Sequence, residues 1–403
     1  MAEDRTGRTV DREFPWPIFD ETDIAAVVEV LRSGKWGSSD CDGAVARFEE
    51  EFARHHGVRH ALATVNGSVA LRMALLAAGV RPGDEVIVPP YTFFATASIV
   101  VEANCVPVFA DIAEETYCID PDSIAEAITG RTRAIIPVHF AGQAADMDRI
   151  MAIAGQHGLA VIEDACHGHG GEYRGRKLGS IGLAGCFSFQ STKNLTAGEG
   201  GCVTTNSEEM RTLISSLRNC GRVAGAPWYH HVYLGCNYRM TQIQAALLLA
   251  QLRRLDGQAR KRDANGRLLN ELLSGIDGIH PLTRGHGETL HPYHIYVFRY
   301  DRTKFGGLHK REFADLLVRE GVPCFIGYPE PLYRQPAFLE KNYFTYYKTD
   351  TPDYGKVRCP VCERACHEEA VWILPPAMLG EREDMERFAL AIRKVQDRIV
   401  GIK

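Results

Sequence analysis

The sequence from 187 to 201 reads Phe187-Ser188-Phe189-Gln190-Ser191-Thr192-Lys193-Asn194-Leu195-Thr196-Ala197-Gly198-Glu199-Gly200-Gly201. A single amine, that of Lys193, stands here between an apolar strand and a glycine-rich turn. Lysine is strongly hydrated and is normally found at exposed positions, so this placement needs an explanation. An amine kept partly out of water can form a Schiff base with a carbonyl compound. We therefore predict that Lys193 is a catalytic residue, in preference to a surface lysine that caps a turn.

A second signal precedes it, where the chain reads Leu159-Ala160-Val161-Ile162-Glu163-Asp164-Ala165. The pattern predicts an apolar strand that ends in the carboxylate of Asp164, and ligands of open α/β sheets bind beyond such strand ends. A carboxylate at this place can pair with the protonated ring nitrogen of pyridoxal phosphate (PLP) and keep the ring cationic. Taken alone, Asp164 would be better explained as a helix N-cap or turn residue. Together with Lys193 it predicts a PLP site.

The phosphate group of PLP needs its own binding site, and we expect it at Asn66-Gly67-Ser68-Val69-Ala70-Leu71. This segment follows a predicted strand and begins a predicted helix. Gly67 allows close approach of the backbone, and amides at a helix N-terminus bind anions. An ordinary N-cap is an equal alternative for this segment alone. Ser188 would add a hydroxyl to the phosphate, and Phe93 would either stack on the pyridine ring or pack in the core.

Short apolar runs alternate with helical periods from residue 59 onward, which predicts an α/β fold with a mainly parallel sheet covered on both faces. The expected strands are 61–65, 85–89, 106–109, 134–139, 160–164, 185–190 and 201–205. We divide the chain into an N-terminal arm (1–15), a large PLP-binding α/β domain (16–250) and a smaller C-terminal α+β domain (251–403). The aromatic segment 327–354 is too apolar for a linker, and we expect it to pack on the substrate or at a subunit interface.

The composition is that of a globular protein of two domains, with 403 residues, 45% hydrophobic and 24% charged. A net charge of -5 argues against nucleic acid as the main partner. No apolar stretch approaches the ~18 residues that a membrane span requires, and the N-terminus has mixed charges instead of the pattern of a signal peptide. We expect a cytoplasmic protein that binds neither nucleic acid nor a membrane.

Twelve cysteines without a secretion signal predict reduced thiols. One group, Cys359, Cys362 and Cys366, has a spacing compatible with zinc or an iron–sulfur cluster. No second Cys-x2-Cys pair is present to close a tetrahedral site. We therefore favour thiols at the start of a helix that act as small apolar side chains, and we expect no metal.

With these segments in view, the chain resembles the DegT/StrS-type sugar aminotransferases, PLP enzymes of fold type I that aminate keto-sugars and keto-cyclitols. The resemblance rests on the Lys193 segment, on Glu163-Asp164-Ala165, on Asn66-Gly67-Ser68 and on Cys236-Asn237-Tyr238-Arg239-Met240. It implies that Lys193 is the Schiff-base lysine and Asp164 the partner of the pyridine nitrogen. His167 would hydrogen-bond the phenolic oxygen of PLP, at a position where the family often has glutamine. Gly67, Ser68 and Ser188 would hold the phosphate, and Phe93 would stack.

The same resemblance implies a homodimer with shared active sites, because Asn237 and Arg239 look like the residues that reach into the neighbouring subunit's site. Asn237 would then contact the cofactor there. The candidate substrate contacts are Trp36, His231, Tyr238, Arg239, His294 and Arg334.

These expectations combine into a PLP-dependent aminotransferase that moves an amino group from glutamate or glutamine to a keto-cyclitol or keto-sugar, in aminosugar or aminocyclitol antibiotic biosynthesis. A nucleotide-linked keto-sugar aminotransferase and an aminobenzoate-type synthase are the alternatives within the family. Gln190, where many members have histidine, and the long aromatic segment both point away from a nucleotide sugar.

Two other activities are weighed against transamination. The PLP-dependent sugar dehydratases of the family carry histidine in place of the lysine, so Lys193 argues against dehydration. A non-catalytic PLP-binding regulator would need a basic recognition helix or an extra DNA-binding domain, and the sequence contains no sign of either.

Overall fold

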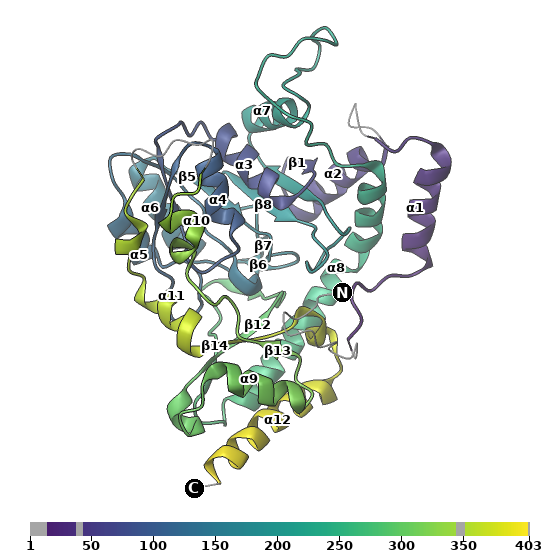
Figure 1. Cartoon of the computed structure of the whole chain (residues 1–403). Helices are drawn as coiled ribbons and strands as arrows, with labels where there is room; N and C mark the ends of the chain where they lie inside the picture. Colours follow the sequence, from purple (N-terminus) through teal and green to yellow (C-terminus); the bar gives the residue numbers. More distant parts are fainter. Residues whose placement is uncertain (1–13, 38–42, 344–350, 402–403) are drawn as a thin grey trace.

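The computed structural model describes residues 14–37, 43–343 and 351–401. Most of the predicted N-terminal arm therefore lies outside the described residues. Figure 1 shows a large upper layer with a central sheet and a smaller lower layer, joined by the long helix α8. The described residues contain no helix that is long and apolar enough to cross a membrane.

The central sheet has seven strands in the order β1-β9-β8-β5-β4-β2-β3. Their bounds are β1 (His60–Thr64), β2 (Glu85–Val88), β3 (Val106–Phe109), β4 (Thr132–Ile135), β5 (Ala160–Asp164), β8 (Ala184–Ser188) and β9 (Gly201–Thr205). Neighbours from β8 to β3 run parallel, whereas β9 is antiparallel to both β1 and β8. The predicted α/β fold with a mainly parallel sheet is confirmed.

Helices cover this sheet, and short polar side chains begin several of them. They are α2 (Gly43–His56), α3 (Gly67–Ala77), α4 (Ala95–Glu102), α5 (Pro121–Ala127), α6 (Met147–His157) and α7 (Glu208–Arg218). Asn66 caps α3, Asp146 caps α6 and Ser207 caps α7, each by accepting a backbone N–H of the first turn. Every residue of β2 is buried, as expected for a parallel strand with helices on both faces.

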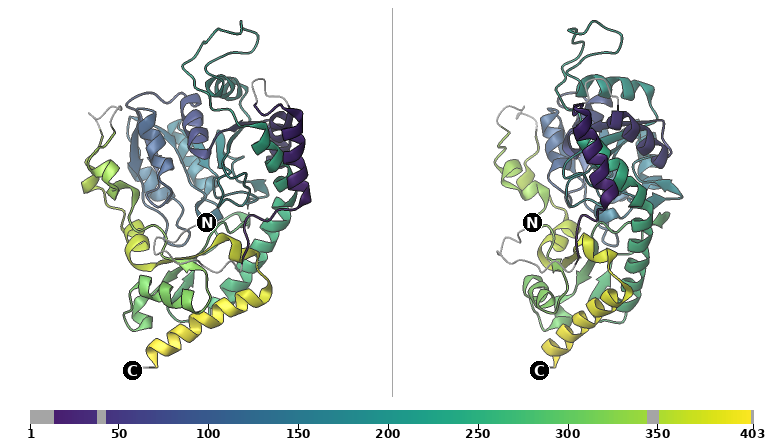
Figure 2. Two further views of the ribbon diagram at one scale, coloured as in Figure 1. Left: turned by 45° about the vertical axis from the view of Figure 1, so that its right-hand side comes forward. Right: turned by 90° about the vertical axis from the view of Figure 1, so that its right-hand side faces the viewer.

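The helix α8 (Gln242–Leu273) is 32 residues long and belongs to both domains. Leu248 and Leu255 pack in the core shared with α2, whereas Leu269 and Leu273 pack in the core of the lower layer. The predicted boundary at residue 250 thus falls inside one continuous helix. The helix α1 (Glu21–Ser33) packs against α8, as both views of Figure 2 show.

The lower layer is a second, antiparallel sheet in the order β10-β12-β14-β13. Its strands are β10 (Ile279–Pro281), β12 (Tyr296–Tyr300), β13 (Cys324–Phe325) and β14 (Ala370–Ile373). The helices α9 (Lys310–Arg319) and α12 (Arg382–Val400) contribute Phe313 and Phe388 to its core, beside Phe298 of β12. A smaller C-terminal α+β unit is present, as predicted.

Part of the C-terminal sequence returns to the large domain. Tyr333, Phe338 and Tyr354 pack around Phe109 of β3, and the Tyr354 hydroxyl donates to the Pro107 carbonyl at 3.0 Å. The short helices α10 (Pro336–Leu339) and α11 (Pro360–Arg364) lie in this part of the chain. The described aromatic side chains of segment 327–354 thus extend the core of the large domain, which the predicted boundary did not anticipate.

Two smaller features complete the fold. A three-stranded sheet is formed by β6 (Glu172–Tyr173), β7 (Arg176–Lys177) and β11 (Glu288–Leu290). Cys359 immediately precedes α11, and the thiols of Cys359, Cys362 and Cys366 are buried and unpaired. Within the described residues, no three or more His, Cys, Asp or Glu side chains are grouped so as to hold a metal ion.

Candidate active site

A cavity of about 550 Å³ lies where the carboxyl ends of β5 and β8 meet the start of α3 and the edge of the second sheet. Lys193 lines it, in the turn that follows β8. This turn is closed by the Lys193 amide, which donates to the Gln190 carbonyl at 2.9 Å, and by the Gln190 side chain, which accepts from Thr192. Burial lowers the pKa of Lys193, while Cys166 and the carboxylate of Asp164 act in the opposite direction.

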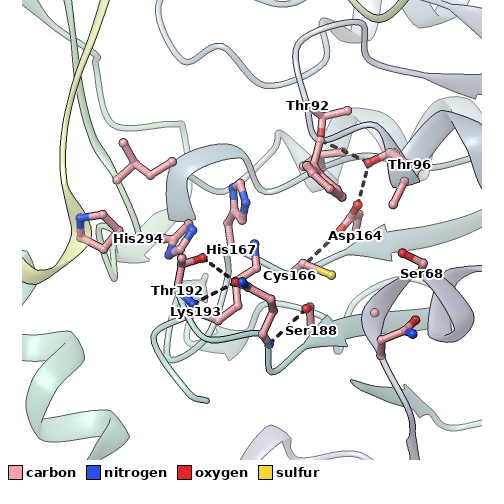
Figure 3. A pocket seen from close by; sticks show the side chains of 18 of the residues that line it. Ser68, Thr92, Thr96, Asp164, Cys166, His167, Ser188, Thr192, Lys193 and His294 are labelled. Carbon is pink, nitrogen blue, oxygen red and sulfur yellow. Dashed lines mark hydrogen bonds between the residues drawn. The ribbon is translucent and has the colours of Figure 1, made fainter. Parts of the chain in front are cut away.

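Asp164 faces the same cavity from the last position of β5, and it is only 5% exposed. Two donors hold its carboxylate: the Thr96 hydroxyl at 2.9 Å and the Cys166 amide at 3.2 Å. The Thr92 hydroxyl lies 3.2 Å from that of Thr96. Because the Thr96 hydroxyl donates to Asp164, the Thr92 hydroxyl is the donor of this second bond. Figure 3 shows the chain of contacts from Thr92 to Asp164.

His167 lies in the cavity with a defined donor atom. The Ala141 amide donates to its Nδ1 at 3.2 Å, so Nδ1 is unprotonated. Burial, and then the positive charge of Lys193, lowers the pKa of His167 well below its usual value, so the ring is neutral and Nε2 carries its proton. This is the tautomer that a hydrogen bond to a phenolate oxygen requires.

The expected phosphate site is a close junction between β8 and α3. Gly67 begins α3, and a Cβ at this position would come within 2.7 Å of the Ser188 Cβ. Ser68 and Ser188 line the cavity beside it. The first backbone N–H groups of a helix have no partner within the helix, and the Asn66 side chain accepts one of them, from Val69, at 2.9 Å. The remaining amides and the hydroxyls are donors suited to a phosphate.

Phe93 lines the cavity and is 62% exposed, so it is not a core residue. Its ring is thus available to a ligand in the cavity that Asp164 also lines. These groups fit PLP part by part. The donors at Gly67 suit its phosphate, and the carboxylate of Asp164 suits its ring nitrogen. The Nε2–H of His167 suits its phenolic oxygen, and the ring of Phe93 suits the face of its pyridine ring.

Other predicted residues do not line this cavity. Asn237 is exposed, and Arg239 donates to Asn219 at 2.8 Å and lines a separate cavity. The backbone carbonyl of Tyr238 accepts from Val65 and from the Thr64 hydroxyl. Trp36 and His231 are exposed, and Arg334 pairs with Glu363 at 2.8 Å. Of the six candidate substrate contacts, this chain brings only His294 to the cavity.

Sequence reasoning missed several lining residues, among them Thr92, Thr96, Tyr328 and Trp372. Thr92 and Thr96 belong to a segment in which only Phe93 was predicted to bind the cofactor. No local pattern in the sequence links the two threonines to Asp164. Tyr328 and Trp372 come from parts of the chain assigned to the smaller domain.

Comparison with known proteins decides the family. Residues 17–389 match the model of the DegT/DnrJ/EryC1/StrS aminotransferase family. The chain belongs to this family. The enzyme is an aminotransferase and its cofactor is PLP.

Relatives of the enzyme match it in sequence or structure over nearly the whole chain. An L-glutamine:2-deoxy-scyllo-inosose aminotransferase of Streptoalloteichus tenebrarius is 36% identical, over 95% of this chain and 95% of the relative. The crystal structure of 3-amino-5-hydroxybenzoic acid synthase superposes with a TM-score of 0.86 at 33% identity, covering 96% of this chain and 99% of that one. That of ntda from Bacillus subtilis, with bound cofactor PMP, has a TM-score of 0.80 at 28% identity, covering 94% and 82%.

Proposed function

We propose that the enzyme transfers the amino group of glutamine or glutamate to the ketone of a keto-cyclitol that carries no nucleotide, in aminocyclitol antibiotic biosynthesis. The similarity to the glutamine:2-deoxy-scyllo-inosose aminotransferase supports the donor and the acceptor class. The nucleotide-linked keto-sugar is the alternative acceptor.

The charge of the cavity favours an acceptor without a nucleotide. Among the described residues of this chain that line it, Lys193 is the only lysine or arginine, while Asp164 and Glu199 are acidic, and the homodimer proposed below would add one further cation, the partner's Arg239. A nucleotide diphosphate or a ring carboxylate is normally bound by arginine or lysine. Phe325, Tyr328 and Trp372 also line the cavity, and their aromatic rings suit the C–H faces of an uncharged ring.

The roles of the residues follow from their chemistry. When bound, PLP supplies an electrophilic carbon and a ring that accepts electrons. Asp164 holds the proton on the ring nitrogen, and His167 donates to the phenolic oxygen. The Lys193 amine would bind the cofactor and, once released from it, would hold and move a proton at the substrate Cα. Gly67, Ser68 and Ser188 hold the phosphate, and Phe93 stacks on the ring.

We further propose a cytoplasmic homodimer in which Asn237, Tyr238 and Arg239 complete the partner's site. Their position outside the cavity of their own chain supports this arrangement. The neighbouring segment exposes Trp228, Tyr229 and Leu234 to extents of 75%, 77% and 99%, which is typical of a subunit interface. The cysteines of the described residues are unpaired, in keeping with a reducing compartment.

The test is spectroscopic and kinetic. Purified enzyme should show the visible absorption band of lysine-bound PLP, which glutamine or glutamate should abolish and a keto-cyclitol should restore. Lys193→Ala should lack the band. Lys177→Ala is the control, because Lys177 pairs with Glu172 and Asp256 outside the cavity, and it should keep the band. Restoration of the band by nucleotide-linked keto-sugars alone would refute the proposed acceptor.

A further inference from the structure

A second buried histidine lies against His167 in the cavity. The ring centroids of His167 and His294 are 4.3 Å apart with an interplanar angle of 39°. Figure 3 shows both near Lys193, on the side of the cavity away from Thr92 and Thr96. Burial, with contributions from His167 and Lys193, lowers the pKa of His294 well below its usual value. Like His167, it therefore carries a single ring proton.

Asn194 determines which nitrogen of His294 carries that proton. The Asn194 Nδ2 donates to the Pro292 carbonyl at 3.0 Å, which leaves Oδ1 to face the imidazole, 3.4 Å from the His294 Nδ1. An amide oxygen can only accept, so Nδ1 of His294 is the donor and Nε2 carries a lone pair. His167 and His294 thus have opposite tautomers, and they offer one donor and one acceptor side by side.

The backbone before His294 is held in an unusual conformation. Tyr293 has a φ of 36°, in the left-handed region that non-glycine residues rarely adopt. Its amide donates to the His291 Nδ1 at 2.9 Å, and its ring stacks on that of His291 with centroids 3.7 Å apart. The ring also fills the space beside Gly266 of α8, where a Cβ would come within 2.2 Å of it. Strain that the surroundings maintain in this way is typical of functional sites.

We propose that the Nε2 of His294 accepts a hydrogen bond from a hydroxyl of the ketone acceptor, on a carbon next to the carbonyl. Asn194 directly follows Lys193 and its side chain faces the His294 Nδ1, and both His294 and Lys193 line the cavity, as Figure 3 shows. Hydroxyls are the groups that distinguish a cyclitol from an apolar ring, and the wall of Phe325 and Trp372 cannot accept from them. His294 therefore selects α-hydroxy ketones. The proposal rests on the proposed function, since it names the acceptor group that this site recognises.

The first test is selectivity. Wild-type enzyme should use 2-deoxy-scyllo-inosose with a kcat/KM about 10- to 100-fold higher than the analogue that also lacks the remaining hydroxyl beside the carbonyl. His294→Phe should reduce this ratio to about twofold or less. His294→Gln keeps an acceptor oxygen and should retain the ratio within about threefold. An equal loss of kcat/KM for both ketones in His294→Phe would overturn the proposal.

Two further measurements do not depend on turnover. Binding of scyllo-inositol, which has no ketone, should weaken about tenfold in His294→Phe and little in His294→Gln. Nitrogen NMR of imidazole-labelled enzyme should show Nε2 unprotonated in His294 and protonated in His167. A protonated Nε2 in His294 contradicts the proposal. If the enzyme transaminates no ketone but the inositol result holds, the proposed function fails and the hydroxyl contact stands. If it transaminates and neither ratio nor binding changes, the contact is wrong.

Discussion

The carboxylate of Asp164 is held in place by hydrogen bonds from Thr96 and Cys166. The Thr96 hydroxyl comes from α4 and donates to one carboxylate oxygen, while the Cys166 amide holds the other. A hydrogen bond to a buried charged group stabilises it by about 1.5–3 kcal/mol. Thr96 is therefore a positioning residue for the carboxylate that is expected to pair with the ring nitrogen.

Replacing Thr96 tests this role. Thr96→Val keeps the shape but removes the hydroxyl, and it should weaken PLP binding about tenfold and shift the pH dependence of the visible band. Thr96→Ser should restore both properties. The measurement is a titration of the apoenzyme with PLP at several pH values. Unchanged binding and an unchanged pH profile in Thr96→Val would exclude the role.

Gly67 offers a second residue-scale prediction. A methyl group at Gly67 would lie 2.7 Å from the Ser188 Cβ, so Gly67→Ala must push α3 and β8 apart at the expected phosphate site. We expect at least a tenfold loss of PLP affinity, measured by the same titration. Gly155→Ala is the matched control, because this α6 glycine has open space around it and alanine favours helix. The control should bind PLP normally and be more stable by up to ~1 kcal/mol.

At the scale of elements, Glu163 ties the turn before β8 to β5. Its carboxylate accepts from the amides of Gly179, Ile181 and Gly182 at 2.6–2.8 Å and from the His139 Nε2 at 2.9 Å. Burial alone would raise the pKa of Glu163, but the hydrogen bonds from His139 and the amides outweigh it, and the net shift is downward. This stabilisation is present above the unfolded-state pKa and is lost as pH falls through the lower folded-state value.

Glu163→Gln should therefore lower the free energy of unfolding by about 3 kcal/mol at pH 7, because one amide oxygen cannot replace a carboxylate with four donors. The difference from wild type should shrink when the pH falls below ~4.5. Denaturant unfolding at pH 7 and at pH 4 measures both effects. Glu208→Gln, at an exposed carboxylate paired with Arg211, should change stability far less. A pH-independent difference would contradict the ionised state of Glu163.

The segment before α1 fastens the lysine turn to α8. The Trp16 indole donates to the Ser191 carbonyl at 2.9 Å, and its ring covers the buried guanidinium of Arg262 at 5.1 Å. No hydrogen-bond partner of that guanidinium is found among the described residues, and burial lowers its pKa to about 9. The Trp16 ring therefore covers the buried charge of Arg262. Its N–H holds the turn that carries Lys193.

Trp16→Phe keeps the ring and loses the N–H, so it should cost about 1 kcal/mol of stability and alter the band of lysine-bound PLP. Trp16→Ala should cost more, because Arg262 then loses its aromatic cover. Trp36→Phe is the control: Trp36 is 54% exposed and donates to the Leu31 carbonyl away from the cavity. Equal effects of Trp16→Phe and Trp36→Phe on the band would show that the contact with Ser191 does not position Lys193.

For the whole molecule, the proposed exchange of Asn237 and Arg239 between subunits can be tested by mixing variants. Lys193→Ala and Arg239→Ala should each be inactive alone. After joint refolding, hybrid dimers with shared sites contain one intact site, so activity should recover to about a quarter of wild type. If each chain supplied its own Arg239, no hybrid site would be intact and no activity would return.

Much of the fold could be predicted from the sequence because its signals are local. The periods of apolar residues predicted β3, β5 and β9 with the observed bounds. Three segments of the cavity could also be recognised in the sequence: the Lys193 turn, the acidic end of β5 and the start of α3 at Gly67. In each of them the functional group and the backbone that positions it are close together in the sequence. The predicted domain boundary at residue 250 fell inside the long helix α8, because this helix passes from the core of the large domain to that of the lower layer while its backbone continues.

Other parts were decided only by the tertiary structure. Thr96 meets Asp164, Trp16 meets Ser191 and Asn194 meets His294 across large separations in sequence. Which side chains meet there depends on how helices and strands pack, and no local pattern encodes that packing. Tyr333 and Phe338 joined the core of the large domain for the same reason: buried apolar surface is stabilising wherever it is covered. The sequence by itself thus determined the reactive groups, and packing decided which neighbours orient them.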